Sequence, residues 1–293
     1  MNSHFSFDID LIRRYDKPGP RYTSYPTAVQ FTDDFGVDDY RSAEGRSQAL
    51  SLYFHIPFCD TVCFYCACNK IATKDRSKAE PYLQALDKEM AMQAAIFDQG
   101  QPVEQLHWGG GTPTFLNNEQ MRWLMGRTAE HFNLLDNDRG EYSIEIDPRE
   151  VRDDTLQVLR DIGFNRMSIG LQDIDERVQL AVNRPQSGAQ TFGTMDKARQ
   201  LGFRSVSLDL IYGLPHQSLD SFSRTLDEVI AHRPDRLSVF NYAHMPERFK
   251  PQRRINAEDL PPPQEKLDIL KMAGDKVQQA GYVYIGMDHV ALP

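Results

Sequence analysis

The sequence of 293 residues lacks several features that would each define a class of protein. No apolar run approaches the about 18 residues of a membrane-spanning helix. The first residues, Met1–Phe5, show no basic stretch followed by an apolar one, so no secretory signal is predicted. There is no excess of basic residues, and the net charge of -9 argues against nucleic acid as a partner. We therefore expect a cytoplasmic protein that binds neither membrane nor nucleic acid.

Cysteine is scarce and unevenly distributed, because all four cysteines lie within ten residues. Cys59, Cys63 and Cys66 form a C-x3-C-x2-C triplet, and Cys68 follows two residues later. A disulfide framework is not expected, because a chain of this length builds its own core and shows no secretory signal. Three thiolates on so short a loop can instead face one centre, either an iron–sulfur cluster or a zinc ion.

The two kinds of metal centre differ in what else they need. Structural zinc usually pairs two Cys or Cys/His knuckles, and no second knuckle exists in this sequence. His55 could add a ligand, but it lies within an apolar strand pattern. The triplet therefore favours an iron–sulfur cluster, with zinc as the alternative. With only three thiolates, a four-iron cube would keep one iron open for a small molecule.

Residues 1–49 are expected to be an irregular arm that packs on the rest of the chain. Helix breakers interrupt this segment, and its aromatic residues suggest that it is pinned to the body; they are Pro18, Gly19, Pro20 and Pro26, and Tyr15, Tyr22, Tyr25 and Phe31. A basic stretch in the arm could meet an anionic ligand or be a solvated surface. It comprises Arg13, Arg14, Lys17 and Arg21.

Strands and helices alternate from residue 50 onward. Apolar runs predict strands at Ser51–Ile56, Gln105–Trp108, Tyr142–Ile146, Arg166–Leu171, Ser205–Ile211 and Leu237–Tyr242, and one more that begins at Tyr282–Ile285. Helical periodicity predicts helices at Glu80–Phe97, Gln120–Phe132, Asp153–Ile162, Ala189–Leu201, Leu219–Ala231 and Gln264–Gln279. Such βαβ units form a parallel sheet that curves towards a barrel. We predict an α/β fold, a partial (β/α)6-type barrel over residues 50–293 that is short of a complete TIM barrel.

Three predicted helices end in the same way. In each, a glycine takes the left-handed conformation that caps a helix, and an aromatic residue enters the next strand. These glycines are Gly163, Gly202 and Gly281. The repeat supports the interpretation as βαβ units.

Polar residues recur where the predicted strands end, which is where parallel α/β folds place their active sites. The cysteine loop follows the first strand, and the run Gly109–Thr112 follows the second. Glycines let a backbone approach a ligand closely and point N–H groups at an anion. Glu145 and Asp209 lie in otherwise apolar strands, where a carboxylate needs a partner. Structural hydrogen bonding to neighbouring loops is the alternative, but the recurrence of such polar residues favours a shared ligand.

Taken together, these motifs resemble the oxygen-independent coproporphyrinogen III oxidases, the HemN family of radical S-adenosylmethionine (SAM) enzymes. The cysteine triplet is typical of the superfamily, whereas Cys68 and the N-terminal segment narrow the resemblance to the family. The motifs are Gly19–Ala28, Tyr53–Cys59 with Cys63, Cys66 and Cys68, His107–Thr114, Glu145–Glu150, Asp209–Pro215 and Gly286–His289.

The resemblance implies a set of cofactors and a site for them. Cys59, Cys63 and Cys66 would bind a [4Fe–4S] cluster, and Cys68 would not bind iron. SAM would take the fourth iron, and a second SAM can sit beside it. The residues implied for the first SAM are Tyr53, Tyr65, Gly110 and Glu145, and those for the second are Gly111, Thr112, Gln172, Arg184, Asp209 and Ala243.

The implied activity is that of an oxidoreductase of anaerobic haem synthesis. It would decarboxylate two propionate side chains of coproporphyrinogen III to vinyl groups and so yield protoporphyrinogen IX. A 5′-deoxyadenosyl radical derived from SAM would abstract hydrogen from the β-carbon of each propionate. An electron donor such as flavodoxin or ferredoxin is implied as a partner, and a monomer is expected.

Members of this family continue into a C-terminal helical domain, which has no counterpart in a sequence that stops at Pro293. The chain is therefore expected to be a fragment or a truncated homologue with a more open site. Two other functions stay open: a haem-binding chaperone on the same barrel, and a truncated inactive homologue that only binds a cluster. Cys68 and the N-terminal segment favour the enzyme over the chaperone.

Overall fold

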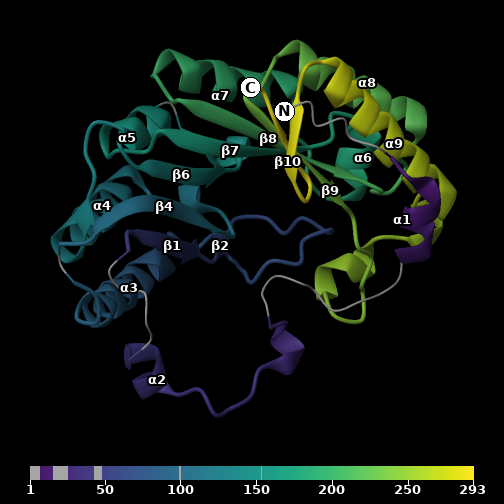
Figure 1. Cartoon of the computed structure of the whole chain (residues 1–293). Coiled ribbons are helices and arrows are strands. Elements are labelled where there is room, and N and C mark those ends of the chain that lie inside the picture. Colours follow the sequence, from purple (N-terminus) through teal and green to yellow (C-terminus); the bar gives the residue numbers. More distant parts are fainter. Residues whose placement is uncertain (1–6, 16–25, 43–47, 99, 153) are drawn as a thin grey trace.

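A curved sheet with helices on its outer side forms the body of the chain (Figure 1). The structure is a computed structural model that describes residues 7–15, 26–42, 48–98, 100–152 and 154–293. Parallel strands follow one another across the sheet in the order β1 (Leu50–Ile56), β4 (Pro102–Gly110), β6 (Glu141–Ile146), β7 (Arg166–Gln172), β8 (Ser205–Tyr212) and β9 (Arg236–Asn241). The predicted α/β fold with six parallel strands is confirmed, and β1 lies at one edge of an open sheet.

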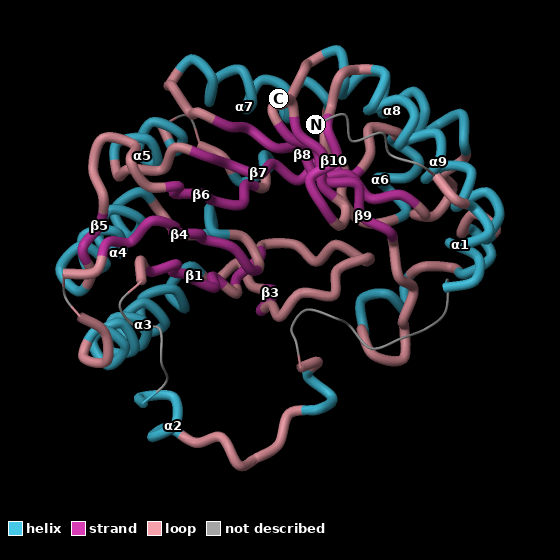
Figure 2. Tube along the Cα trace, in the orientation of Figure 1, coloured by secondary structure: helices cyan, strands magenta, loops and turns pink. Residues whose placement is uncertain are grey.

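The helices that connect these strands lie along the convex side of the sheet (Figure 2). They are α3 (Ala79–Ala94), α4 (Asn118–His131), α5 (Thr155–Asp161), α7 (Gly188–Gln200), α8 (Leu219–Ala231) and α9 (Pro263–Gln279). The short helix α6 (Glu176–Ala181) instead packs near the cysteine loop. Short 3-10 helices occur at Ala28–Gln30, Arg76–Lys78, Pro113–Phe115, Pro148–Glu150, Lys250–Arg254 and Ala257–Asp259. In the part of the chain that the structure describes, no helix has the length and apolar character needed to cross a membrane.

The strands alternate between apolar and polar residues because only their convex face packs on helices. On β8, Val206, Leu208 and Leu210 are fully buried in the core, whereas Ser207 and Asp209 line a cavity on the concave side. A parallel sheet covered on both faces would show a continuous apolar run instead. The concave face is thus polar along its length, and the candidate site residues Glu145 and Asp209 lie on it.

The three predicted glycine caps are confirmed. Gly163, Gly202 and Gly281 follow α5, α7 and α9 with φ values of 104°, 80° and 89°. At each, the glycine N–H and that of the next residue donate to carbonyls of the last helical turn, as in a Schellman motif. The aromatic residues that follow, Phe164, Phe203 and Tyr282, are buried in the core.

The end of the sheet differs from the prediction. The strand expected at Tyr282–Ile285 is present as β10 (Val283–Gly286), but it does not pair with β9. The chain turns back at Met287 and Asp288, and β11 (His289–Ala291) lies between them, antiparallel to both neighbours. A parallel neighbour of β9 would need a crossover connection, whereas a tight turn permits only an antiparallel pair.

The N-terminal arm contacts the body at two places far apart in the fold (Figure 1). In α1 (Ile9–Tyr15), Arg13 Nη2 donates to Gln264 Oε1 on α9 at 2.6 Å. Near the end of the arm, the Tyr40 hydroxyl in α2 (Val37–Ser42) donates to Gln93 Oε1 on α3 at 2.8 Å. The arm predicted as irregular therefore contains short helices. Lys17, Arg21 and the other predicted arm residues from 16 to 25 lie outside the described residues.

Asp138 holds the loop before β6 in place, and the effect of its replacement on the free energy of unfolding should depend on pH. Its carboxylate accepts hydrogen bonds from both Nη atoms of Arg160, at 2.9 and 2.5 Å, which hold the pKa of Asp138 below its usual range. We expect Asp138→Asn to lower the free energy of unfolding by about 1 kcal/mol at neutral pH. A carboxylate with a depressed pKa contributes stability above its unfolded pKa, so the difference should shrink below about pH 4. Urea unfolding at several pH values measures this, and a pH-independent difference would contradict it.

Candidate active site

The two ends of the cysteine loop are held together directly after β1. The two-residue strand β2 (Phe58–Cys59) pairs in parallel with β3 (Ile71–Ala72), and Thr73 N–H donates to the Cys59 carbonyl at 2.9 Å. The loop between them is thereby placed at the carboxyl ends of the strands. Its cysteines line a cavity of about 170 Å³ together with residues from β4, β6, β7 and β8.

The thiols in this cavity suit an iron–sulfur cluster. All four cysteines are free; Cys59 and Cys63 are buried, Cys66 is half-buried and Cys68 is exposed. Burial raises the pKa of Cys59 to about 11, while a hydrogen bond from Cys68 lowers the pKa of Cys66 to about 6. In the described parts of the chain, no three Cys, His, Asp or Glu side chains converge on a position for one metal ion. Cys59, Cys63 and Cys66 all line this one cavity, as a cluster held by three thiolates requires.

Side chains from the segments that follow neighbouring strands donate hydrogen bonds to the cysteine sulfurs. Thr112 Oγ1 lies 3.5 Å from Cys59 Sγ, and Arg184 Nη1 lies 3.5 Å from Cys63 Sγ. Arg149 Nη2 lies 3.7 Å from the same Cys63 sulfur. Hydrogen bonds and positive charge at the sulfurs stabilise thiolates, and they raise the reduction potential of a cluster. His55, considered as a zinc ligand, instead places its ring nitrogens 3.0 Å from the Tyr53 hydroxyl and 2.8 Å from the Asn69 carbonyl.

The glycine run packs its backbone against the cysteine loop. Gly110 has a φ of +118°, and its N–H donates to Glu145 Oε2 at 3.1 Å. Gly111 N–H donates to the Ile56 carbonyl at 2.8 Å, and a Cβ at Gly111 would lie 2.7 Å from the carbonyl oxygen of Pro57. Only glycine fits at that distance, so the run sets the spacing between the loop after β4 and the cysteines.

This close approach predicts the effect of one added methyl group. Gly111→Ala should displace the cysteine loop, lower the free energy of unfolding by about 1–3 kcal/mol and reduce the iron bound per chain. Gly126→Ala is the matched control, because Gly126 is exposed on α4 and a Cβ there meets nothing within 4 Å. The control should keep its iron and gain about 0.5–1 kcal/mol of stability. Equal iron content in both variants would contradict the prediction.

The two carboxylates predicted as site residues project from neighbouring parts of the sheet into the same cavity. Glu145 on β6 accepts the Gly110 N–H and lies 3.4 Å from His107 Nε2, whose Nδ1 lies 2.6 Å from Ser143 Oγ. Asp209 on β8 accepts a hydrogen bond from Ser168 Oγ at 2.8 Å. Burial raises the pKa of Asp209. Both carboxylates can thus accept from hydroxyl or ammonium groups of a ligand.

Asp147 is a site residue that the sequence prediction missed. It follows β6, and its carboxylate accepts hydrogen bonds from Arg149 Nη2 at 2.7 Å and from Arg184 Nη1 at 3.0 Å. Burial acts to raise the pKa of Asp147, but the two arginines outweigh it and hold that pKa below its usual range. The signal was available, because Asp147 directly follows the third predicted strand and lies within the motif Glu145–Glu150, to which no role beyond Glu145 was assigned.

Most of the predicted SAM-contacting residues do share one cavity. Eight line it with the three cysteines: Tyr65, Gly110, Gly111, Thr112, Glu145, Gln172, Arg184 and Asp209. Gln172 stands at a β-bulge with a φ of 68°, a backbone strain that often marks functional sites. Tyr53 and Ala243 do not line this cavity. Tyr53 stacks on the His107 ring with centroids 5.8 Å apart, and Ala243 is exposed in the loop after β9.

The fold and the cysteine loop agree with a comparison to known families. Residues 53–229 match the Radical SAM superfamily, a range that covers more than half of the chain. The chain therefore belongs to the Radical SAM superfamily, which implies a [4Fe–4S] cluster and SAM as its cofactors.

Within that superfamily, the chain is similar to oxygen-independent coproporphyrinogen III oxidases. It is 57% identical over 291 residues to the one from Pseudomonas aeruginosa and 50% identical over 289 residues to the one from Escherichia coli (strain K12). Each comparison covers 98% of this chain and 63% of the relative. The solved structure of coproporphyrinogen III oxidase (HemN) from Escherichia coli matches with a TM-score of 0.91 and 49% identity, over 98% of this chain and 64% of that one. The resemblance expected from the motifs is confirmed. The chain spans less than two thirds of the length of these relatives.

Proposed function

We propose that this chain catalyses the oxidative decarboxylation of coproporphyrinogen III to protoporphyrinogen IX without oxygen. The observation that supports this most is the convergence of the cysteine triplet, the glycine run and the two strand carboxylates on one cavity. The similarity to named coproporphyrinogen III oxidases across nearly the whole chain is the basis for proposing coproporphyrinogen III as the substrate. The reaction belongs to anaerobic haem synthesis, and we place it in the cytoplasm, with a monomer as the active form.

Cys59, Cys63 and Cys66 would hold the cluster in this proposal. When bound, the cluster and SAM together supply a 5′-deoxyadenosyl radical. The residues of the chain would bind and orient the first SAM: Glu145 and the backbone of the glycine run would contact its amino and carboxylate groups, and Tyr65 would lie beside it. Tyr53 would contact this SAM from outside the cysteine cavity. A second SAM would meet Gly111, Thr112, Gln172, Arg184 and Asp209 in the cavity and Ala243 outside it.

The remaining parts of the reaction need partners and a closed site. Each propionate loses one hydrogen atom from its β-carbon, then one electron and CO2, so that a vinyl group remains. The electron leaves to an acceptor, and a flavodoxin or ferredoxin supplies the electron that cleaves SAM. A radical of this reactivity requires water to be excluded. The aromatic N-terminal arm would contribute to that exclusion and would contact the substrate.

The test is an anaerobic turnover assay. The chain is reconstituted with iron and sulfide and incubated with SAM, a strong reductant and coproporphyrinogen III, and the products are followed by mass spectrometry. Loss of two CO2 together with 5′-deoxyadenosine is the expected result. Deoxyadenosine without decarboxylation would overturn the substrate assignment for this chain. Absence of both, in conditions where a full-length relative reacts, would indicate a chain that binds a cluster at most, and haem absorbance on the purified protein would favour a chaperone.

A further inference from the structure

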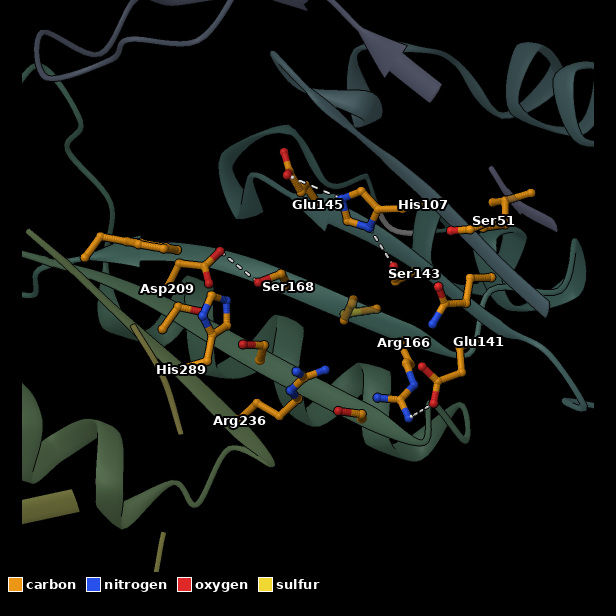
Figure 3. A pocket seen from close by; sticks show the side chains of 17 residues that line it. Ser51, His107, Glu141, Ser143, Glu145, Arg166, Ser168, Asp209, Arg236 and His289 are labelled. Carbon is orange, nitrogen blue, oxygen red and sulfur yellow. Dashed lines mark hydrogen bonds and ion pairs between the residues drawn. The ribbon is translucent and has the colours of Figure 1, made fainter. Parts of the chain in front are cut away.

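A second cavity of about 440 Å³ lies on the concave face of the sheet (Figure 3). Its shared lining places it next to the cysteine cavity. The two share three lining residues, Glu145, Ser168 and Asp209, from neighbouring strands. This second space, here called the lumen cavity, extends from that shared wall towards the amino ends of the strands. Its volume lies within the range of about 300–1,000 Å³ that is usual for small-molecule sites.

The lumen cavity is lined mainly by hydroxyl and charged groups. Its serines come from β1 and from β6 to β9 and are Ser51, Ser143, Ser168, Ser205, Ser207 and Ser238. Serine hydroxyls can donate to an anion and carry no charge of their own. A lumen meant only to be filled by the chain would instead hold bulky apolar side chains, as complete barrels do.

Two arginines project into this cavity, and they differ in one respect. Arg166 is already occupied, because its Nη2 donates to Glu141 Oε1 at 2.6 Å. Arg236, on β9, has no hydrogen bond or ion pair to its guanidinium from any residue that the structure describes. Figure 3 shows the Arg236 side chain reaching into the cavity from β9, on the same side as His289. A half-buried guanidinium with its donors free is suited to take a planar anion on its fork.

The register of the strands relates Arg236 to the shared wall. Ser207 is paired with Arg236, and Asp209 is paired with Ser238, so Arg236 lies two residues below the level of Asp209. At about 3.3 Å per residue, this is a step of roughly 7 Å away from the wall. The acidic groups Glu145 and Asp209 line the wall itself. An anionic ligand is therefore repelled at the wall and attracted one step beneath it.

We propose that the lumen cavity receives a propionate-bearing pyrrole of the substrate and that Arg236 binds its carboxylate. This inference rests on the proposed function, because the tetrapyrrole supplies the carboxylate. With the carboxylate on Arg236, the aliphatic carbons of the propionate extend towards the wall shared with the cysteine cavity. Arg236 is then a substrate-binding residue that separates the carboxylate from the acidic wall and directs the carbon chain to the site of radical formation.

The test measures binding without turnover. The fluorescent, oxidised form of the substrate, coproporphyrin III, is titrated into the full chain, its Arg236→Gln variant and Arg224→Gln. Arg224 is exposed on the outer helix α8, so that control loses the same charge elsewhere. Arg236→Gln should bind about 10- to 100-fold more weakly, as expected for removal of a charge-assisted hydrogen bond. Arg224→Gln should bind as the unaltered chain does, and coproporphyrin III tetramethyl ester, which lacks the charges, should not distinguish the three proteins.

Further readouts separate a binding role from loss of structure. Arg236→Lys keeps the positive charge but loses the paired N–H donors of the guanidinium. It should therefore bind several-fold more tightly than Arg236→Gln, with the unfolding midpoint of the unaltered chain. Formation of deoxyadenosine without substrate should be the same in Arg224→Gln as in the unaltered chain. Unaltered coproporphyrin affinity of Arg236→Gln, in a chain that converts coproporphyrinogen III, would overturn the role of Arg236 and leave the proposed function in place. An unaltered chain that neither binds nor converts the tetrapyrrole would overturn both.

Discussion

Replacement of Cys63 by alanine is expected to abolish cluster binding and all formation of 5′-deoxyadenosine. Cys63 is buried, and its sulfur is the one that two guanidinium groups, of Arg149 and Arg184, approach. Because the thiolate is the ligand, alanine leaves a four-iron cluster with two protein ligands and one more exposed iron. The measurement is iron and sulfide per chain after anaerobic reconstitution, followed by deoxyadenosine formation with SAM and a strong reductant.

Cys68 provides the matched control for this experiment. It lies in the same loop but is exposed, and it is not expected to bind iron. Cys68→Ser should therefore keep the iron and sulfide content of the unaltered chain. If Cys68→Ser lost its iron and Cys63→Ala kept it, the assignment of ligands within the loop would be wrong.

Replacement of Asp147 by alanine is expected to cause the largest loss of stability of any single polar substitution in the site. The carboxylate of Asp147 is flanked by Arg149 and Arg184, and the Arg184 side chain is only 8% exposed. Removal of one partner of a buried ion pair leaves uncompensated charge, which typically costs about 3–5 kcal/mol. Urea unfolding of Asp147→Ala at neutral pH measures this, and the iron content should fall as well because both arginines contact Cys63.

An exposed ion pair serves as the comparison. Lys276 Nζ lies 2.6 Å from Asp227 Oδ1, and the Asp227 side chain is 67% exposed. Such pairs contribute about 0–1 kcal/mol, so Asp227→Asn should unfold almost as the unaltered chain does. A similar small effect for both variants would mean that the arginine pair in the site finds other partners and that Asp147 does not organise it.

The prediction of the fold from the sequence succeeded where the signal is local. Strand alternation and glycine caps depend on residues a few positions apart, and the expected strands and helices were found within a few residues. The end of the chain was misjudged at β10 and β11. The segment after Tyr282 is short and apolar, and its composition does not tell whether it joins the sheet directly or through a hairpin, because that choice depends on the turn at Met287 and on the free edge of β9.

The prediction of the site succeeded through a rule about topology combined with a resemblance. Residues at the carboxyl ends of parallel strands were expected together, and Gly110, Glu145 and Asp209 do line one cavity with the cysteines. The rule does not say which partner each side chain takes. Arg184 was expected to contact the second SAM, and in the structure it contacts Asp147, Cys63 and the Gly170 carbonyl.

The order of the residues alone was enough to specify a curved parallel sheet with a thiol-rich loop at the carboxyl end of its first strand. Apolar periodicity and cysteine spacing can be read along the chain itself. The periodicity determines the fold, because the apolar residues must be buried. The contacts of Arg184 and Asp147, and the lack of a partner for Arg236 among the described residues, could not be read in the same way. They are set by the curvature and register of the sheet, which bring side chains from separate segments within hydrogen-bonding distance and leave the Arg236 guanidinium without a partner among the described residues.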